Sequence, residues 1–240
     1  MGRDRMGGDG RSRPRSAPLR NRVTPEGEIV ATAHRGLLMG NRGGAFHLPD
    51  QTLGPRRWST KQWIACVLEF KGRHRQVMQP KRYTELFFLD EATALAAGHR
   101  PCFECRRADA ERFAELWAQS QGRPPGRPQS GFGRERAPAM DEALHAERLD
   151  RRGGKRTFRA RRADLPSGTF VRYGLAGEGS RPCLIVGNQL MAWHPAGYTS
   201  LITPAMTGEI VDVLTPLSIV AVLSAGYRPM LHPSAATLLD

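Results

Sequence analysis

YTELFFLDEATALAAGHRPCFEC (83–105) is the stretch of the sequence that decides the predicted fold. Its first part, YTELFFL (83–89), is rich in strand-forming residues and predicts a buried strand. Asp90 is a good helix N-cap, and Gly98 suits the left-handed position that follows a last helical turn. These two signals predict a helix over EATALAA (91–97), and a second helix is expected over 107–120.

Cys102 and Cys105 follow directly on this predicted helix end. A spacing of two residues lets two thiolates bind the same tetrahedral zinc ion. A thioredoxin-like redox pair usually stands at the start of a helix and follows a strand, whereas here a helix and a glycine precede the pair. The spacing therefore favours a zinc site, with two incidental cysteines as the plain alternative.

DEATALAAGHRPCFEC (90–105) resembles the second half of the zinc-binding domain of the DNA-repair regulator Ada, and the resemblance covers residues 83–107. The matching residues are Phe87, Phe88, Asp90, Ala96, Ala97, Gly98, Arg100, Pro101, Cys102 and Cys105. This resemblance implies an Ada-like module, a bound zinc ion and contact with DNA. The segments GNRGGAFH, WIACVLEFKGR and RYTELFFLDEATALAAGHRPCFECRR together also resemble a set of uncharacterised bacterial proteins, which implies no activity.

The chain departs from Ada at the upstream pair of zinc ligands, because it has no Cys-x-x-x-Cys. The cysteine that accepts a methyl group in that family belongs to this pair, so methyl transfer is not implied. Cys66, within the predicted strand 62–70, is the expected third ligand. A histidine is expected as the fourth ligand, with His47 as first choice and His74 as the alternative, while His99 is expected to pack as an aromatic residue.

The charge of the chain points to a polyanionic partner. The 240 residues carry a formal net charge of +13, which favours DNA or RNA through release of counterions. The run RRGGKRTFRARR (151–162) contains no acidic residue. The residues expected to contact nucleic acid are Arg151, Arg152, Lys155, Arg156, Arg159, Arg161 and Arg162. A solvated charged loop is the alternative interpretation of this run.

The predicted fold class is α+β, with a small Ada-like zinc module followed by a small β-rich domain with a terminal helix. That helix is expected from Thr215, as N-cap, to about Ala225. No apolar run approaches the ~18 residues of a membrane span, so a cytoplasmic protein is expected. The predicted parts are a disordered basic arm (1–22), the zinc module (23–120), a linker (121–139), a helix with a basic segment (140–162) and the β-rich domain (163–240).

A hydrolase or nucleic-acid-modifying enzyme is the rival function. Asp141 and His145 are four residues apart on a predicted helix, where a carboxylate can orient a histidine as general base. His194 and His232 are the other weak catalytic candidates, because both lie in expected loops. A protein-interaction module with an incidental basic tail is the third alternative.

Two further features are interpreted as structural. GNRGG (40–44) lacks the Lys-Ser/Thr ending of a Walker loop and predicts a flexible turn. Cys183 lies in RPCLIVG (181–187), where a buried strand is expected to use cysteine as a small hydrophobic residue.

Overall fold

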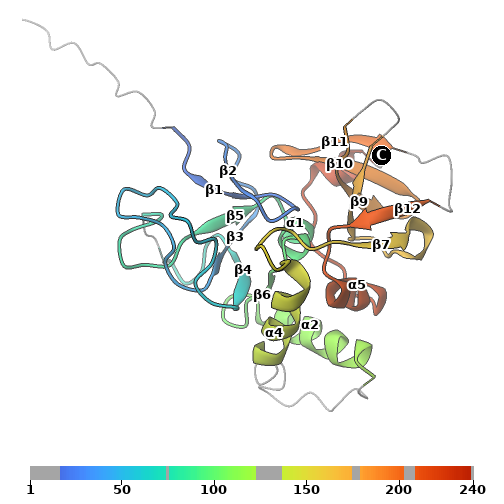
Figure 1. The fold of residues 1–240 in the computed structure, drawn as a ribbon, viewed down its shortest axis with the longest axis horizontal. Coiled ribbons are helices and arrows are strands. Elements are labelled where there is room, and N and C mark those ends of the chain that lie inside the picture. Colours follow the sequence, from blue (N-terminus) through green and yellow to red (C-terminus); the bar gives the residue numbers. More distant parts are fainter. Residues whose placement is uncertain (1–16, 74–75, 123–136, 175–178, 203–208, 239–240) are drawn as a thin grey trace, which may run out of the picture.

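The computed structural model describes residues 17–73, 76–122, 137–174, 179–202 and 209–238. Within these residues it contains two six-stranded sheets and a group of helices, so the α+β class is confirmed (Figure 1). In the same residues no helix has both the length and the apolar character needed to cross a membrane.

The first sheet is mixed and is built from the first half of the chain. Its strands are β1 (Arg20–Val23), β2 (Ile29–Ala31), β3 (Leu38–Arg42), β4 (Trp63–Val67), β5 (Leu86–Phe88) and β6 (Arg100–Pro101). The strand order is β2-β1-β5-β3-β4-β6. The pairs β1–β5 and β4–β6 are parallel, and the other pairs are antiparallel. This sheet holds all the strands near the predicted zinc ligands.

The second sheet is antiparallel throughout. Its strands are β7 (Phe158–Arg161), β8 (Phe170–Tyr173), β9 (Arg181–Val186), β10 (Gln189–His194), β11 (Gly197–Ile202) and β12 (Ile210–Val213). The order is β11-β10-β9-β8-β12-β7. Strands β8, β9, β10 and β12 lie where the β-rich C-terminal half was predicted, whereas β7 and β11 were not expected.

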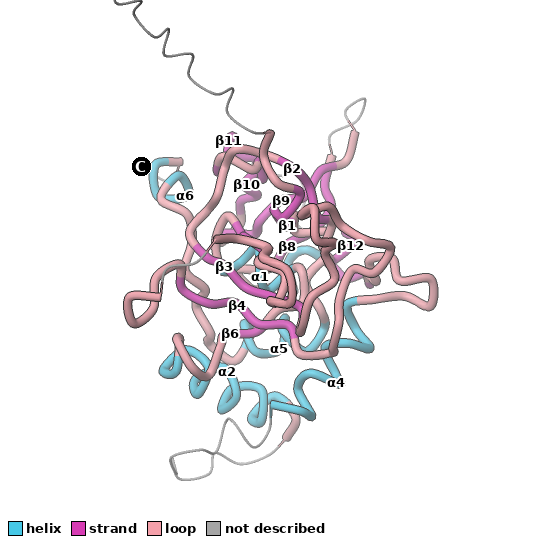
Figure 2. Tube along the Cα trace, turned by 90° about the vertical axis from the view of Figure 1, so that its left-hand side faces the viewer, coloured by secondary structure: helices cyan, strands magenta, loops and turns pink. Residues whose placement is uncertain are grey.

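The helices gather mainly at one end of the strands, where α2, α4 and α5 pack together (Figure 2). The helices are α1 (Glu91–Ala96), α2 (Arg107–Ser120), α4 (Ala137–Arg148), α5 (Leu217–Ser224), α6 (Ser234–Thr237) and a 3₁₀ turn at Arg162–Asp164. Phe113, Met140 and Ile219 form part of the core between the three helices. The carboxylate of Glu147 accepts the backbone N–H of Ser218 at 2.8 Å, which caps the first turn of α5.

Helix α1 forms where the sequence predicts it and is buried between the two sheets. Asp90 accepts the N–H of Thr93 at 2.9 Å, and Gly98 has φ +83°, as the cap and left-handed residue that were expected. One side of α1, with Ala94, packs into the core of the first sheet, and the other side, with Ala92, packs into the core of the second. The two parts of the chain therefore share this helix.

Four local expectations are corrected. Strand β1 contains the last residues of the arm predicted to be disordered, although residues 1–16 lie outside the described part. The helix expected at 140–152 runs from Ala137 to Arg148. Thr215 does not cap α5, because its hydroxyl accepts the N–H of Phe170 at 2.8 Å. The GNRGG segment is largely strand β3 rather than a turn.

Candidate metal centre

The position of Cys66 follows from strand β4, in which successive side chains point to opposite faces of the sheet. Trp63 and Ala65 are buried in the interior, while Ile64 and Cys66 lie on the opposite face of the sheet and are half-buried. The antiparallel register pairs Cys66 with Met39 of β3. The cysteine therefore faces away from the apolar core.

The segment from Cys102 to Cys105, here called the knuckle, is held against β4 by backbone hydrogen bonds. The N–H of Cys102 donates to the carbonyl of Ala65 at 3.0 Å. The N–H of Arg106 donates to the carbonyl of Cys102 at 3.0 Å, which closes the turn directly before α2. The N–H of Glu104 points to the Cys102 sulfur at 3.4 Å, a contact that stabilises a thiolate.

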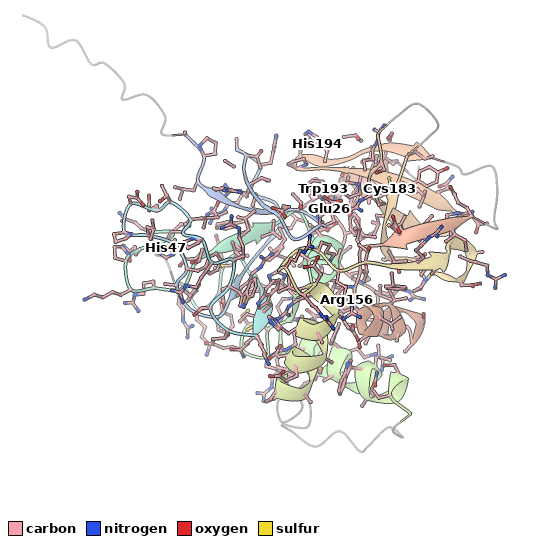
Figure 3. All side chains as sticks on the ribbon, in the orientation of Figure 1. Glu26, His47, Arg156, Cys183, Trp193 and His194 are labelled. Carbon is pink, nitrogen blue, oxygen red and sulfur yellow. The ribbon has the colours of Figure 1, made fainter. Side chains whose placement is uncertain are left out.

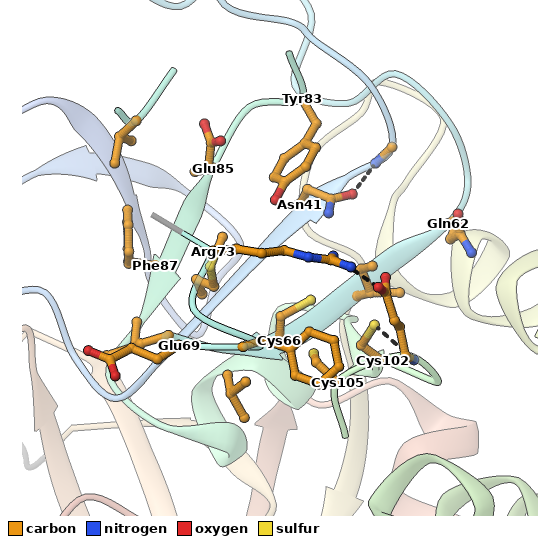
Figure 4. A pocket seen from close by; sticks show the side chains of 18 of the residues that line it. Asn41, Gln62, Cys66, Glu69, Arg73, Tyr83, Glu85, Phe87, Cys102 and Cys105 are labelled. Atoms are coloured by element: carbon orange, nitrogen blue, oxygen red, sulfur yellow. Dashed lines mark hydrogen bonds and ion pairs between the residues drawn. The ribbon is translucent and has the colours of Figure 1, made fainter. Parts of the chain in front are cut away.

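The two elements bring three sulfurs together. The ligand atoms of Cys66, Cys102 and Cys105 all lie within 4.8 Å of one another (Figure 4). Tetrahedral zinc with Zn–S bonds of about 2.3 Å needs sulfurs about 3.8 Å apart, so a contraction of about 1 Å at most is required. Three soft thiolates are also the donor set that zinc favours. The residues present therefore fit a zinc ion.

The protons of the three thiols are coupled. Hydrogen bonds from Cys105 and Cys66 lower the pKa of Cys102, because they stabilise its thiolate. The same contacts with Cys102 and Cys105, together with burial, raise the pKa of Cys66 well above its usual value. The cluster thus already favours one thiolate at Cys102, the form in which cysteine binds metal.

The sulfurs line a cavity of about 660 Å³ that opens to solvent (Figure 4). Its polar lining includes Asn41, Gln62, Arg73 and Glu85. Glu85 is only 2% exposed, and one of its carboxylate oxygens accepts the N–H of Met78 at 2.7 Å. The other oxygen has no hydrogen-bond partner among the residues that the structure describes. The cysteine cluster therefore lies on the wall of a cavity with both polar and apolar lining.

The histidines expected as fourth ligand are not brought to the sulfurs by the described residues. His47 has Nδ1 2.8 Å from the Thr84 hydroxyl and Nε2 3.2 Å from the carbonyl of Gln79, and it is not part of the cysteine cluster. His74 lies outside the described residues. His99 is fully buried between the rings of Trp63 and Phe88, in the packing role that was expected.

Cys183 lies in the buried strand β9 and outside the cluster. Its side chain is fully buried, and burial raises the pKa of its thiol to about 11. The prediction that this cysteine packs as a small hydrophobic residue agrees with that position. Figure 3 shows Cys183 in the C-terminal sheet and His47 at the far side of the other sheet.

The basic run 151–162 is not a free loop. Its second half is strand β7, which pairs with β12. Lys155 points inward and donates to the carbonyl of Ala96, and the buried Arg162 donates to the carbonyl of Asn188 at 3.1 Å.

Two more members of the run have partners at the surface. Arg156 donates to the carbonyl of Ala146, and Arg161 pairs with Asp164. The exposed residues of the run without a side-chain partner in the described structure are Arg151, Arg152 and Arg159.

The weak catalytic candidates do not form one site. Both carboxylate oxygens of Asp141 accept from Arg100, at 2.9 and 2.8 Å, so Asp141 does not orient His145. His145 instead accepts from Arg148 through Nδ1 at 3.0 Å and lies against Trp58.

The remaining two histidines are held elsewhere. His194 lies at the end of β10 (Figure 3). Its ring is beside that of His34, with the ring centroids 6.2 Å apart. His232 is bonded to the Ser234 hydroxyl at 2.8 Å through Nδ1.

The polar lining of the cavity was not anticipated from the sequence. The usable signal was the period of two in QWIAC, which places Gln62, Ile64 and Cys66 on one face. Asn41 lies on the same face of the neighbouring strand, opposite Ile64. Recognising β3 as a strand would have been needed to find it.

Compared with known proteins, the chain matches no family model, no curated protein and no solved structure. The likeness to the Ada zinc-binding domain thus rests on the residues quoted from the sequence, and the structure adds only that its two cysteines, Cys102 and Cys105, form a candidate metal site with Cys66.

Proposed function

We propose that this protein binds one zinc ion through the thiolates of Cys66, Cys102 and Cys105, and that the ion is structural. The observation that carries this proposal is the convergence of three sulfurs within 4.8 Å from two separate elements. A zinc ion there would join strand β4 to the knuckle that leads into α2. The ion supplies cross-linking between segments distant in sequence, as structural zinc does in small domains.

We propose His74 as the fourth ligand. It directly follows Arg73, whose guanidinium pairs with Glu104 of the knuckle at 2.9 Å. The ion pair holds the residue before His74 at the knuckle, which supports His74 as a ligand. His47 is less suited, because both of its ring nitrogens are already engaged with Thr84 and Gln79. A Cys₃His set closes a structural site.

The experiment is metal analysis of the purified full-length chain. We expect close to one zinc ion per chain, and Cys66→Ser, Cys102→Ser and Cys105→Ser should each lose most of it. Cys183→Ser is the matched control, because that thiol lies outside the cluster, and it should keep the zinc. Full zinc content in Cys102→Ser would refute the proposal.

Cobalt substitution tests the fourth ligand separately. Cobalt bound by three thiolates and an imidazole absorbs differently from cobalt bound by three thiolates and water. His74→Ala should therefore shift the visible spectrum, whereas His47→Ala should leave it unchanged. An unchanged spectrum in His74→Ala removes only the assignment of the fourth ligand.

We further propose contact with DNA or RNA. The net charge of +13 and the exposed arginines Arg151, Arg152 and Arg159 support this. Replacing these three by glutamine should weaken binding to a labelled oligonucleotide and reduce its salt dependence. Arg107→Gln with Arg112→Gln is the matched control, because these exposed arginines pair with Glu111 and Glu115 on α2. If all variants bound the oligonucleotide with the same affinity and the same salt dependence, these arginines would have no part in nucleic-acid binding.

A further inference from the structure

The strongest feature outside the metal centre is a group of buried cations behind the sheet. Arg42 and Arg148 are 2% and 1% exposed, and their guanidinium carbons lie 4.0 and 3.8 Å from the ring of Trp63. Lys155 reaches into the same place from the loop before β7. Two buried guanidinium groups and one half-buried lysine therefore meet behind the sheet.

Their hydrogen bonds all go to neutral groups. Arg42 donates to His99 Nε2 and to the carbonyls of Gly27 and Arg57.

Arg148 donates to the carbonyls of Gly98 and Lys61 and to His145, while its Nε has no partner in the described part of the chain. Within the described residues, no carboxylate accepts from either guanidinium.

Glu28 and Asp141 attract Arg42 and Arg148 only from a distance, and burial lowers the pKa of both guanidinium groups. Burying a cation without a directly bonded anion costs several kcal/mol, so an anion in contact with this group would be stabilised.

A small cavity of about 40 Å³ lies among these groups. The charged residues that line it are Arg42, Arg57, Arg148, Lys155, Glu26 and Glu28. Since one water molecule needs about 10–15 Å³ of such a cavity, there is room for roughly three waters, or for one small oxyanion in their place.

The two acidic residues do not balance the cations. Glu26 accepts from Arg172 at 3.0 and 2.8 Å through one carboxylate oxygen, and its attraction for Lys155 is outweighed by the burial of that lysine. Glu28 is exposed, so water screens it. Burial, and after it the neighbouring Arg42, lowers the pKa of Lys155 to about 7, which agrees with mutual repulsion among the cations.

We propose that this cavity binds a tetrahedral oxyanion, a phosphate or sulfate group, held by Arg42, Arg148 and Lys155. Guanidinium groups match the geometry of such oxygens, and a lysine adds a point charge. Both a free inorganic ion and the terminal phosphate of a nucleotide chain have this chemistry. The site is separate from the metal centre, because Arg42 and Trp63 lie on the opposite face of β3 and β4 from Asn41 and Cys66.

The test is the thermal unfolding of the zinc-loaded full-length chain in phosphate and in chloride at equal ionic strength. Phosphate at about a hundred times its dissociation constant should raise Tm by about 5 °C or more relative to chloride. Lys155→Met should abolish this difference while it keeps the zinc content. Arg151→Met is the matched control, since this exposed arginine of the same loop should retain the shift.

Equal Tm in phosphate and chloride overturns the proposal, as does a full phosphate shift in Lys155→Met. If Lys155→Met is too unstable to study, Lys155→Arg should keep a phosphate shift and Arg42→Lys should reduce it.

Oligonucleotides distinguish the source of the anion. At least tenfold tighter binding of a 5′-phosphorylated oligonucleotide than of its 5′-hydroxyl form supports a terminal phosphate. A Tm shift with inorganic phosphate alone supports the free ion.

Discussion

The two faces of the β3–β4 pair carry opposite chemistry. One face presents the sulfur of Cys66 and polar side chains to an open cavity, and on the other face the buried Trp63 contacts the guanidinium groups of Arg42 and Arg148. Both faces come from the same two strands, because successive side chains point to opposite sides. In our proposals one face binds a metal cation and the other binds an oxyanion, so a single sheet would separate two sites for ions of opposite charge.

The largest expected difference between the faces comes from the metal. Cys105→Ser should lower the free energy of unfolding by several kcal/mol, because zinc binding contributes directly to folding stability. Urea unfolding with and without a chelator measures this. The chelator should destabilise the unmodified chain and Cys183→Ser strongly, and it should leave Cys105→Ser unchanged. If the chelator destabilised Cys105→Ser as much as the unmodified chain, the proposal of a metal ion on this face would be wrong.

The second largest difference is expected between Trp63 and Ile64, two adjacent residues of β4 that face opposite sides of the sheet. Trp63 is 1% exposed, and Trp63→Ala should cost about 3–5 kcal/mol because it leaves a cavity and removes the ring beside Arg42 and Arg148. Ile64 is half-buried on the cavity face, and Ile64→Ala should cost only about 1 kcal/mol. Denaturant unfolding measures both variants. Similar costs would mean that the two faces are packed alike.

The cationic face should also respond to pH. Because burial lowers the folded-state pKa of Lys155 to about 7, the unfolded chain binds more protons between about pH 7 and pH 10, and stability rises with pH there. Between about pH 6 and about pH 8.5, this lysine should contribute about 2 kcal/mol of added stability.

Lys155→Met isolates that contribution, because the remaining titrating groups are common to both chains. Between about pH 6 and about pH 8.5, the free energy of unfolding of the unmodified chain should rise by about 2 kcal/mol more than that of Lys155→Met. Phosphate should reduce it, since a bound anion favours the charged lysine. Parallel pH profiles would contradict the burial of this charge.

The smallest effect is expected at the rim of the metal cavity. Arg73 and Glu104 form an ion pair at 2.9 Å, but both side chains are about half exposed. Glu104→Gln should therefore change the free energy of unfolding by less than about 1 kcal/mol and leave zinc content unchanged. A larger loss would show that the ion pair, rather than the metal, holds the knuckle.

Elements with local signals were predictable from the sequence. Asp90 and Gly98 mark both ends of α1, and the predicted bounds of α2 are the observed ones. The pair Cys102 and Cys105 identifies the knuckle by spacing alone. Cys66 was chosen as the only upstream cysteine, and the pairing of β4 with β6 is what brings it to them.

Elements that depend on distant partners were not predictable. The sequence of strand β3 resembles that of a loop. Its Gly40 is needed for packing, because a Cβ atom at this position would lie 2.1 Å from the carbonyl oxygen of Ile64. Likewise, the sequence of β7 is typical of a solvated basic loop, and this segment forms a strand because it pairs with β12. The inward direction of Lys155 follows from this tertiary arrangement rather than from its neighbours in sequence.

The position of the cysteines along the chain has a consequence for synthesis on the ribosome. The last thiol of the cluster is residue 105 of 240, so all three sulfurs are made before any strand of the second sheet. At about 5–20 residues per second, synthesis from Cys105 to the end of β12 takes on the order of ten seconds. During that time the face of α1 that bears Ala92 and Ala96 has no partner, because it packs on Phe170 and Leu184. Early zinc capture would hold the first sheet and α1 in place until the nascent C-terminal half arrives to cover them.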